Sequence, residues 1–535
     1  MKSTARAICV LLLIGSLNSL PAQTAPTALP SGVQRVTSVE GVTEYRLPNG
    51  LRILLVPDSS RPSVTVNITY LVGSRNESYG ETGMAHLLEH MLFKGTPTHT
   101  KISQEISQHG ADANAMTTDD RTSYFETVAA TEENLDWALS LEADRMVNSF
   151  IARKDLDSEM TVVRNEFERG ENDPMSVLYE RVMETAYLWH NYGHPTIGAR
   201  SDIERVPIEH LQAFYHAYYR PDNAVLVVAG KIDESKTLAL IQAKFGPLAK
   251  PASVMPQPYT EEPAQDGERR AILRRVGDVQ VVMAAYHIPS GGHPDAVAMQ
   301  VLGSILSNPA SGRLRKRLVD TKLATTADAQ AERLHDAGVI AFTAATPKGG
   351  NLDVLRDKLI GVAQGVAHEP LTQAELDREL RQRALDFDRL MTDTTGLAME
   401  LGGAAGLGDW RLLFWQRDQE QKTKLADLQR VAKQYLLPSN LTVGLFIPDE
   451  KPMRAAIPAS PDYVAVLKDY AGQSQMNAGE QFEPTPANIE SRTKRSSIGP
   501  IKLAFLTKKN RGHRVNAFAN HKHIVTRYTI EYALY

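Results

Sequence analysis

Apolar and polar residues alternate near the N-terminus in short runs that predict β-strands. Residues 42–46 alternate like a half-buried strand, and a second apolar run covers residues 51–56. Asn49-Gly50 lies between them and is a strong hairpin signal, because both residue types tolerate positive φ. Another β-branched run, residues 62–72, predicts a further strand that is followed by a glycine-punctuated loop.

Longer segments after this loop have the character of helices. They are expected near residues 83–92, 101–109, 132–148 and 154–171, with a strand at 123–129. The last helix is expected to stop at Asp173-Pro174, since proline cannot continue a helix. Strands and helices mixed along the chain predict an α+β fold in which helices cover a sheet.

Five prolines between Gly246 and Gly267 predict an inter-domain linker. Beyond it the pattern partly repeats: residues 341–357 resemble 124–139, and residues 501–506 echo 51–56. Repeated domains are therefore expected, with a truncated third copy at the C-terminus. The expected ranges are a first domain at 31–250, a linker at 251–268, a second domain at 269–465, a linker at 466–497, and a truncated third repeat with an irregular tail at 498–535.

Composition indicates an ordinary globular protein. The 535 residues are 42% hydrophobic and 23% charged with a formal net charge of −4, which argues against a disordered, collagen-like or disulfide-stapled chain. The 59 basic residues do not exceed the 63 acidic ones, and they form no dense cluster. The electrostatic signature of a nucleic-acid-binding protein is therefore missing, and no nucleic-acid partner is expected.

The N-terminal residues have the pattern of a secretory signal peptide. Lys2 and Arg6 precede a short apolar run, and small residues follow near Ala22, so residues 1–22 are expected to be removed on export. A short N-terminal anchor is the alternative, but no segment is long enough for a stable membrane span. The only cysteine, Cys9, lies in the apolar run, which favours a periplasmic or secreted protein without disulfides.

The segment His86-Leu87-Leu88-Glu89-His90 is the main indication of chemistry. On a helix, histidines at i and i+4 project from one face, so two imidazoles can bind one cation, and Glu89 can hold a water bound to it. The alternative is a pair of surface histidines beside a salt-bridged glutamate.

A catalytic zinc needs a third protein ligand and one position open to water. Glu166 is the candidate, and Glu159, seven residues earlier, faces the same way on the predicted helix, with apolar residues between the two. Both glutamates could instead form surface salt bridges with Arg153, Arg164 or Arg169.

These residues, with their surroundings, resemble the pitrilysin-like zinc peptidases, the inverzincin family that includes insulin-degrading enzyme and mitochondrial processing peptidase. The resemblance covers about residues 40–450 and is carried by Gly83–Thr96, Glu166, Asn114–Asp119, Tyr124-Phe125-Glu126, Tyr218–Gly230 and Ser311–Leu314.

The resemblance implies two homologous α/β domains, the first catalytic and the second a supporting copy without the motif. It implies His86, His90 and Glu166 as ligands of one Zn2+ per chain, Glu89 as general base and Glu159 as an accessory carboxylate. The peptide substrate would pair with an exposed strand edge formed by Asn114, Ala115, Met116 and Thr117, although Asn114 alone also fits a simple turn. The implied activity is that of a zinc metalloendopeptidase acting on peptides or unfolded segments.

The C-terminal region departs from this pattern. Family members often contain two such halves, but here the next half is expected to start near Ile501 and to lose its alternation after Val515. A homodimer or a second pitrilysin-like chain could complete the missing wall of the chamber. The alternative function is a truncated, non-catalytic peptide-binding fragment or partner subunit.

Overall fold

The computed structural model describes residues 29–472, 478–511, 514–521 and 524–531, with side chains up to Arg511. The predicted signal peptide therefore lies outside the described residues. The chain divides into two compact units, Met1–Pro452 and Met453–Tyr535. Among the described residues, no helix combines the length and the apolar character needed to cross a bilayer.

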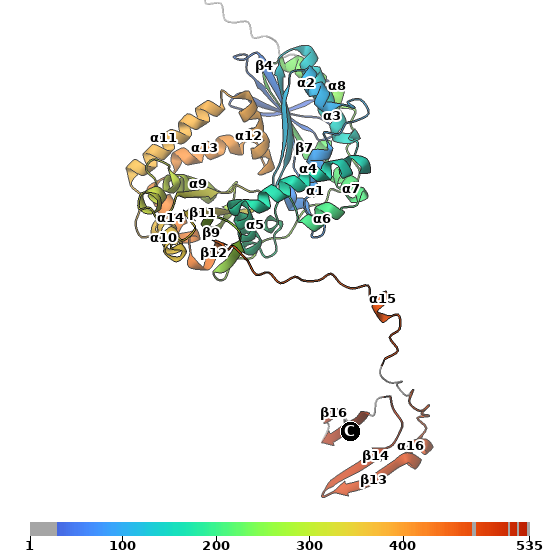
Figure 1. The fold of residues 1–535 in the computed structure, drawn as a ribbon. Coiled ribbons are helices and arrows are strands. Elements are labelled where there is room, and N and C mark those ends of the chain that lie inside the picture. The colour runs from blue at the N-terminus through green and yellow to red at the C-terminus, as the bar shows by residue number, and fades with distance from the viewer. Residues whose placement is uncertain (1–28, 473–477, 512–513, 522–523, 532–535) are drawn as a thin grey trace, which may run out of the picture. The chain divides into compact units, whose positions relative to one another are not determined.

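A seven-stranded mixed sheet organises the first part of the larger unit, in the order β1-β2-β3-β7-β4-β6-β5. Its strands β4 and β7 are labelled in Figure 1, beside the helices that cover the sheet. The strands are β1 (Gln34–Val39), β2 (Val42–Arg46), β3 (Arg52–Pro57), β4 (Ser63–Tyr70), β5 (Asp112–Thr117), β6 (Thr122–Ala129) and β7 (Ala224–Gly230). The predicted hairpin is confirmed, since β2 and β3 pair antiparallel across Asn49-Gly50. The strand β7 is parallel to β3 and antiparallel to β4, and all its residues are buried, because helices cover both faces of the sheet.

Four helices of this first domain, α1 to α4, lie close to their predicted bounds, and four more follow them. They are α1 (Met84–Met91), α2 (Ile102–Gln108), α3 (Glu132–Asn148), α4 (Arg153–Asn172), α5 (Pro174–Ala186), α6 (Arg200–Arg205), α7 (Ile208–Tyr218) and α8 (Glu234–Phe245), with short 3-10 turns η1 (Ser74–Asn76), η2 (Asn191–Gly193) and η3 (Pro221–Asn223). Pro174 ends α4 as predicted, but it also begins α5, where a missing N–H is harmless at the first helical position. The Asp173 side chain caps α5 by accepting a hydrogen bond from the Ser176 N–H at 2.7 Å.

A five-stranded sheet follows, in the order β10-β11-β9-β12-β8. Its strands are β8 (Arg269–Arg275), β9 (Val279–Ser290), β10 (Thr326–Ala331), β11 (Ala337–Pro347) and β12 (Leu441–Pro448). The associated helices are α9 (Pro294–Ser307), η4 (Arg315–Val319), α10 (Leu352–Gly365), α11 (Gln373–Leu390), α12 (Thr394–Gly406), α13 (Leu412–Lys422), α14 (Leu425–Tyr435) and η5 (Pro438–Asn440).

The two sheets have the same connectivity. In each, the first of the five equivalent strands pairs parallel with the last (β3 with β7, β8 with β12), the last pairs antiparallel with the second (β4, β9), and a hairpin strand forms the edge (β5, β10). The expectation of homologous α/β domains with sheets covered by helices is confirmed. In the second domain, the position of α1 after β4 is taken by α9 after β9, and this helix lacks the histidine motif.

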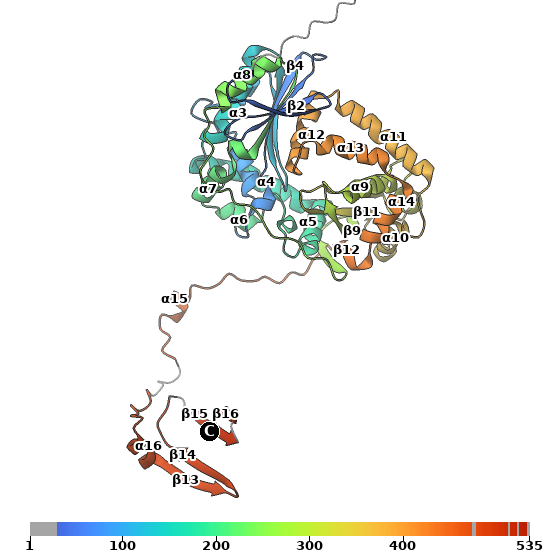
Figure 2. The ribbon, with the colours of Figure 1, turned by 180° about the vertical axis from the view of Figure 1, so that it is seen from behind.

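The two domains exchange helices. Helix α12, from the second half of the unit, packs against β4 and β7 of the first sheet, while α5 packs against β9 and β12 of the second (Figure 2). Glycines permit both approaches: a Cβ on Gly402 of α12 would lie 2.9 Å from Asn67 Nδ2, and one on Gly444 of β12 would overlap Val182 of α5. This exchange packs each sheet against a helix from the other domain and holds the two domains together.

The C-terminal unit contains α15 (Tyr463–Leu467), α16 (Pro486–Arg492) and the antiparallel pairs β13 (Thr493–Ile498) with β14 (Ile501–Leu506) and β15 (Arg514–His521) with β16 (Ile524–Glu531). The tail after Val515 was expected to be irregular, and this was wrong, because β15 and β16 pair along their whole length. None of the described side chains of residues 453–511 is buried. The third repeat and the domain boundaries stay predictions.

Candidate active site

Helix α1 carries His86, Glu89 and His90, and Glu77 holds its N-terminus. The Glu77 carboxylate accepts hydrogen bonds from the backbone N–H groups of Gly83 at 2.8 Å and Ala85 at 2.7 Å. These donors have no partner within the helix, so a buried carboxylate at this end fixes where the helix begins. Burial raises the pKa of Glu77 to about 8, although the two backbone hydrogen bonds oppose the shift.

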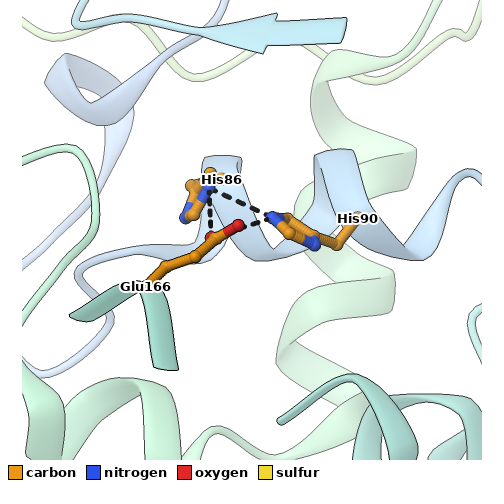
Figure 3. A group of neighbouring side chains, drawn as sticks. All are labelled: His86, His90 and Glu166. Carbon is orange, nitrogen blue, oxygen red and sulfur yellow. Dashed lines mark hydrogen bonds and ion pairs between the residues drawn. The ribbon is translucent and has the colours of Figure 1, made fainter. Parts of the chain in front are cut away.

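The structure brings His86 and His90 together with Glu166 of α4 (Figure 3). The two Nε2 atoms lie 3.2 Å apart, and Glu166 Oε2 lies 3.6 Å from His86 Nε2 and 3.4 Å from His90 Nε2. Helical spacing puts the two histidines on one side of α1, and the packing of α4 against α1 brings Glu166 to them. Among the described residues, no other group of three or more His, Cys, Asp or Glu side chains has ligand atoms arranged for a metal ion.

The separations of these three atoms fit zinc. Tetrahedral coordination at bond lengths of about 2.0–2.1 Å puts neighbouring ligand atoms about 3.3–3.4 Å apart, close to the observed distances. Burial, together with the neighbouring His90, lowers the pKa of His86 to about 4, so its imidazole is neutral and has a lone pair available. The side chain of Glu166 remains 39% exposed, so the open side of the triad faces solvent.

Glu89 points to the same region and is held by the strand that follows α2. Its Oε2 accepts a hydrogen bond from Thr117 Oγ1 at 2.5 Å, at the end of β5. Burial raises the pKa of Glu89, and the Thr117 hydrogen bond works against this shift. A carboxylate with a raised pKa accepts a proton more readily than an ordinary glutamate does.

Glu159 lies on the other side of His90. Its Oε1 is 3.0 Å from His90 Nδ1, and its other oxygen forms an ion pair with Lys94. Burial would raise the pKa of Glu159, but the hydrogen bonds with Lys94 and His90 outweigh it and leave the pKa lowered. An ionised carboxylate beside Nδ1 favours the tautomer with the proton on Nδ1, which leaves the lone pair of His90 on Nε2, the atom that lies near His86 and Glu166.

Neither glutamate forms the surface salt bridges considered as alternatives. In the described part of the chain, Arg153 pairs with Asp157 and Arg164 with Glu204, while Glu159 and Glu166 have no ion pair with an arginine. The predicted orientation of both carboxylates toward one side of α4 is therefore what the structure has.

The stretch Asn114–Thr117 belongs to β5, the edge strand of the first sheet. It pairs with β6 on one side only, so the backbone groups on its outer side have no strand partner among the described residues. Asn114 is exposed, and its side chain accepts a hydrogen bond from the Ala115 N–H at 2.9 Å. This edge strand ends at Thr117, whose hydroxyl donates a hydrogen bond to the Glu89 carboxylate.

A clasp from the second domain supports the segment that leads into α1. Asp336, in the turn between β10 and β11, binds Arg75 Nη1 at 2.8 Å and His190 Nε2 at 3.1 Å. Arg75 also binds Asp120 at 2.9 Å, and Asn191 Nδ2 donates to the carbonyl oxygens of Arg75 and Glu77. The second domain therefore contacts the turn whose Glu77 caps the histidine helix.

Glu77, Lys94 and the Asp336 clasp were not found from the sequence. Lys94 follows His90 by four residues but lies beyond the end of α1 at Met91, so only its closeness in sequence to the motif could have pointed to it. Glu77 and Asp336 give no such signal, because their partners lie in loops or in another domain.

Two family models match the chain in succession. Residues 52–200 match the insulinase family of peptidases, M16, and residues 205–383 match the M16 inactive domain. The second description agrees with the absence of the histidine motif from the second domain.

Several relatives are named zinc proteases. The zinc protease PqqE of Helicobacter pylori is 32% identical over 415 residues, which cover 75% of this chain and 92% of the relative. An uncharacterized zinc protease of Mycobacterium leprae is 29% identical over 339 residues, covering 63% of this chain and 76% of the relative. These names support a protease role for the chain.

Solved structures show the same fold. A protease from Helicobacter pylori superposes with a TM-score of 0.73 at 30% identity, covering 76% of this chain and 99% of that one. Pitrilysin superposes with a TM-score of 0.63 at 17% identity, covering 80% of this chain and 47% of pitrilysin. From the two family models, the relatives and the shared fold, we conclude that the chain belongs to the insulinase family of peptidases, M16.

Proposed function

We propose that the protein is a zinc-dependent endopeptidase that hydrolyses peptides or unfolded segments. The observation that carries the proposal is the triad of His86, His90 and Glu166, whose ligand atoms have tetrahedral spacing and an open side. Glu89 on the same helix supports catalysis over a structural metal, since a structural site has four protein ligands and no base. His86, His90 and Glu166 would hold one Zn2+ per chain.

Bound zinc would polarise the scissile carbonyl and increase the acidity of a water molecule at the site. Glu89 would take a proton from the attacking water and pass it to the leaving amine, with Thr117 keeping its carboxylate in place. Glu159 would act through His90, whose ring it orients. No covalent intermediate with the protein is needed.

The substrate would bind as an extra strand on the outer side of β5. Asn114, Ala115 and Met116 offer backbone groups there, and pairing through the main chain tolerates many sequences. Because β5 ends at Thr117 beside Glu89, a peptide on this edge would pass the metal triad.

The test is zinc content and cleavage of an unstructured peptide, measured on the same preparations. Glu89→Gln is expected to keep one zinc per chain and to lose cleavage by about 10³-fold or more. His86→Ala and Glu166→Gln are expected to lose the metal itself. Glu168→Gln is the matched control: it removes an exposed carboxylate from α4, the helix of Glu166, and is expected to keep both zinc and cleavage.

If Glu89→Gln cleaves the peptide as fast as the wild-type chain, Glu89 is not the general base. If Glu166→Gln keeps its full zinc content, Glu166 is not a zinc ligand. Inactivity of the wild-type chain with zinc bound would favour a non-catalytic peptide-binding subunit instead.

We also propose that a second copy, or another chain of this family, faces the open side of the site. The support is that the chain covers only 47% of pitrilysin. Light scattering on the purified chain, with and without peptide, tests this. Export to the periplasm or secretion is proposed from the pattern of residues 1–22, and N-terminal sequencing of the exported protein tests it.

A further inference from the structure

Three charged side chains of the first domain are buried together between α3 and β6. Glu142 and Arg145 lie one turn apart on α3, and Glu126 lies on β6. Glu126 is 1% exposed, and Glu142 and Arg145 are fully buried. Glu126 belongs to the segment Tyr124-Phe125-Glu126, which carries part of the family resemblance but has no role in the metal triad or in the substrate strand.

The charges of this cluster do not balance if every group is ionised. Arg145 Nη1 lies 2.5 Å from Glu142 Oε1 and 3.4 Å from Glu126 Oε1. In the described part of the chain, neither glutamate forms an ion pair with another cation. Two carboxylates around one guanidinium would leave a buried net negative charge, and an uncompensated buried charge is strongly destabilising.

One proton removes this imbalance. The second oxygens, Glu126 Oε2 and Glu142 Oε2, are buried and have no hydrogen-bond donor among the described residues. The two carboxyl groups are nevertheless in hydrogen-bonding contact with each other, and such a contact requires that one of them carries a proton. Burial, together with the charge of Glu142, raises the pKa of Glu126 well above its usual value. Glu126 is also the glutamate farther from Arg145, so it is the group that keeps the proton.

The guanidinium of Arg145 also contacts two aromatic rings. Its central carbon lies 4.8 Å from the ring centre of Tyr124 and 5.1 Å from that of Phe93. Aromatic faces attract cations, so the rings compensate Arg145 Nε and Nη2, which have no hydrogen-bond partner in the described part of the chain. Tyr70 and Tyr124, the other titratable groups that face Arg145, are neutral because burial raises the pKa of both.

Phe93 connects the cluster to the metal site. It lies two residues beyond Met91, the end of α1, and its neighbour Lys94 forms the ion pair with Glu159. Glu159 in turn lies 3.0 Å from Nδ1 of His90. The ring that rests on Arg145 is therefore adjacent in sequence to the lysine that holds the partner of a histidine ligand.

A backbone hydrogen bond fixes the same segment. Phe150, two residues beyond the end of α3, donates its N–H to the carbonyl oxygen of Gly95 at 2.8 Å. The end of α3 thus holds residues 93–95 both through the Phe93 ring and through the main chain. Loss of the guanidinium would release the ring and allow this segment to shift.

We propose that protonated Glu126, Glu142 and Arg145 form a neutral buried cluster that positions Lys94 and, through Glu159, the zinc-binding ring of His90. The inference rests on the proposed zinc site and adds three positioning residues behind it. Substitutions in the cluster should therefore weaken zinc binding although none of its members touches the metal.

Infrared difference spectroscopy of the full, zinc-free chain at neutral pH tests the proton. A protonated carboxyl group has a C=O stretching band that carboxylates lack, so subtracting the spectrum of Glu126→Gln from that of the wild-type chain should leave this band. Glu133→Gln, which changes an exposed carboxylate of α3, is the matched control and should leave none. If the band is missing from the Glu126→Gln difference spectrum, both carboxyl groups are ionised and the neutral cluster is refuted.

Thermal unfolding tests the balance of charges. Glu126→Gln puts an amide in place of the protonated carboxyl and should lower Tm by only about 2–4 °C. Glu126→Gln/Glu142→Gln leaves the guanidinium without a counter-charge and should lower Tm by about 10 °C or more. Adding Arg145→Met removes that unpaired charge, so the triple variant should recover most of the lost Tm. A triple variant no more stable than the double variant would contradict the assignment of charges.

Zinc affinity separates positioning from a purely structural role. The triple variant lacks the guanidinium that holds Phe93, so its zinc Kd should be about fivefold higher than that of the wild-type chain, and Lys94→Met should raise Kd about tenfold. Because both changes act through Glu159, adding Lys94→Met to the triple variant should raise Kd no further than Lys94→Met alone. An unchanged Kd in the triple variant, or effects that simply multiply, would overturn the positioning role.

The positioning role and the peptidase function fail in different ways. A wild-type chain that binds zinc but cleaves no peptide would refute the peptidase function, and the Kd values would still decide the positioning role. A wild-type chain that binds no zinc would refute the metal site and the positioning role together, and the infrared band would still decide whether Glu126 is protonated.

Discussion

Replacing Gly444 with alanine should destabilise the contact between β12 and α5, one of the two helix exchanges that join the domains. A Cβ at this position of β12 would overlap Val182 Cγ2 and lie 3.0 Å from Leu178 Cδ1, both on α5. Carbon atoms pack best at about 3.5–4.0 Å, so α5 must shift by roughly half an ångström or more, or both side chains must change rotamer. Overpacking of this kind costs about 1–3 kcal/mol, and the overlap with Val182 puts Gly444→Ala near the upper end.

The assay is urea and thermal unfolding of the zinc-free chain. A loss of about 2–3 kcal/mol corresponds to a Tm lowered by roughly 4–12 °C for a domain of about 200 residues. Adding Val182→Ala removes the methyl group that causes the overlap, so the double variant should be more stable than the sum of the single changes by about 1 kcal/mol or more.

Gly361→Ala is the matched control. Gly361 lies exposed in the middle of α10, and a Cβ added there would have nothing within 4 Å, so alanine should stabilise the helix by about 0.5–1 kcal/mol. Unchanged stability of Gly444→Ala, or no coupling with Val182→Ala, would show that the close approach of α5 to β12 does not restrict the chain as described.

Three further predictions concern the groups around the site. Thr117→Val should lower kcat about tenfold and move the acidic limb of the pH–rate profile to higher pH, because the hydrogen bond that it removes holds the pKa of Glu89 down. Thr117→Ser keeps the hydroxyl and should preserve both kcat and the pH–rate profile. A double-mutant cycle of Arg75→Met and Asp336→Asn should give a coupling of about 1 kcal/mol in the free energy of unfolding. A coupling of zero would show that this ion pair does not stabilise the contact between the domains. Burial raises the pKa of Glu77 to about 8, so between about pH 4.5 and 8 the folded chain keeps a proton that the unfolded chain loses. This group therefore makes the free energy of unfolding fall as pH rises. Glu77→Gln should flatten that slope in urea titrations at several pH values.

Much of the first domain could be predicted from local pattern. The hairpin at Asn49-Gly50, helix α3 at Glu132–Asn148 and the proline boundary at 173–174 depend on residues close together in sequence, and each is where the pattern placed it. The tail was predicted less well: loss of alternation after Val515 suggested irregular structure, but the backbones of β15 and β16 pair there.

For the candidate site, the sequence by itself determined that His86 and His90 share one side of a helix and that Glu159 and Glu166 share one side of another, since helical geometry fixes those relations over a few turns. Tertiary structure alone decided that the two helices meet so that Glu166 completes the triad while Glu159 orients His90. The clasp joins Arg75 to Asp336, which lie far apart in sequence. Contacts across such separations depend on how whole sheets and exchanged helices pack, and no local pattern of side chains encodes them.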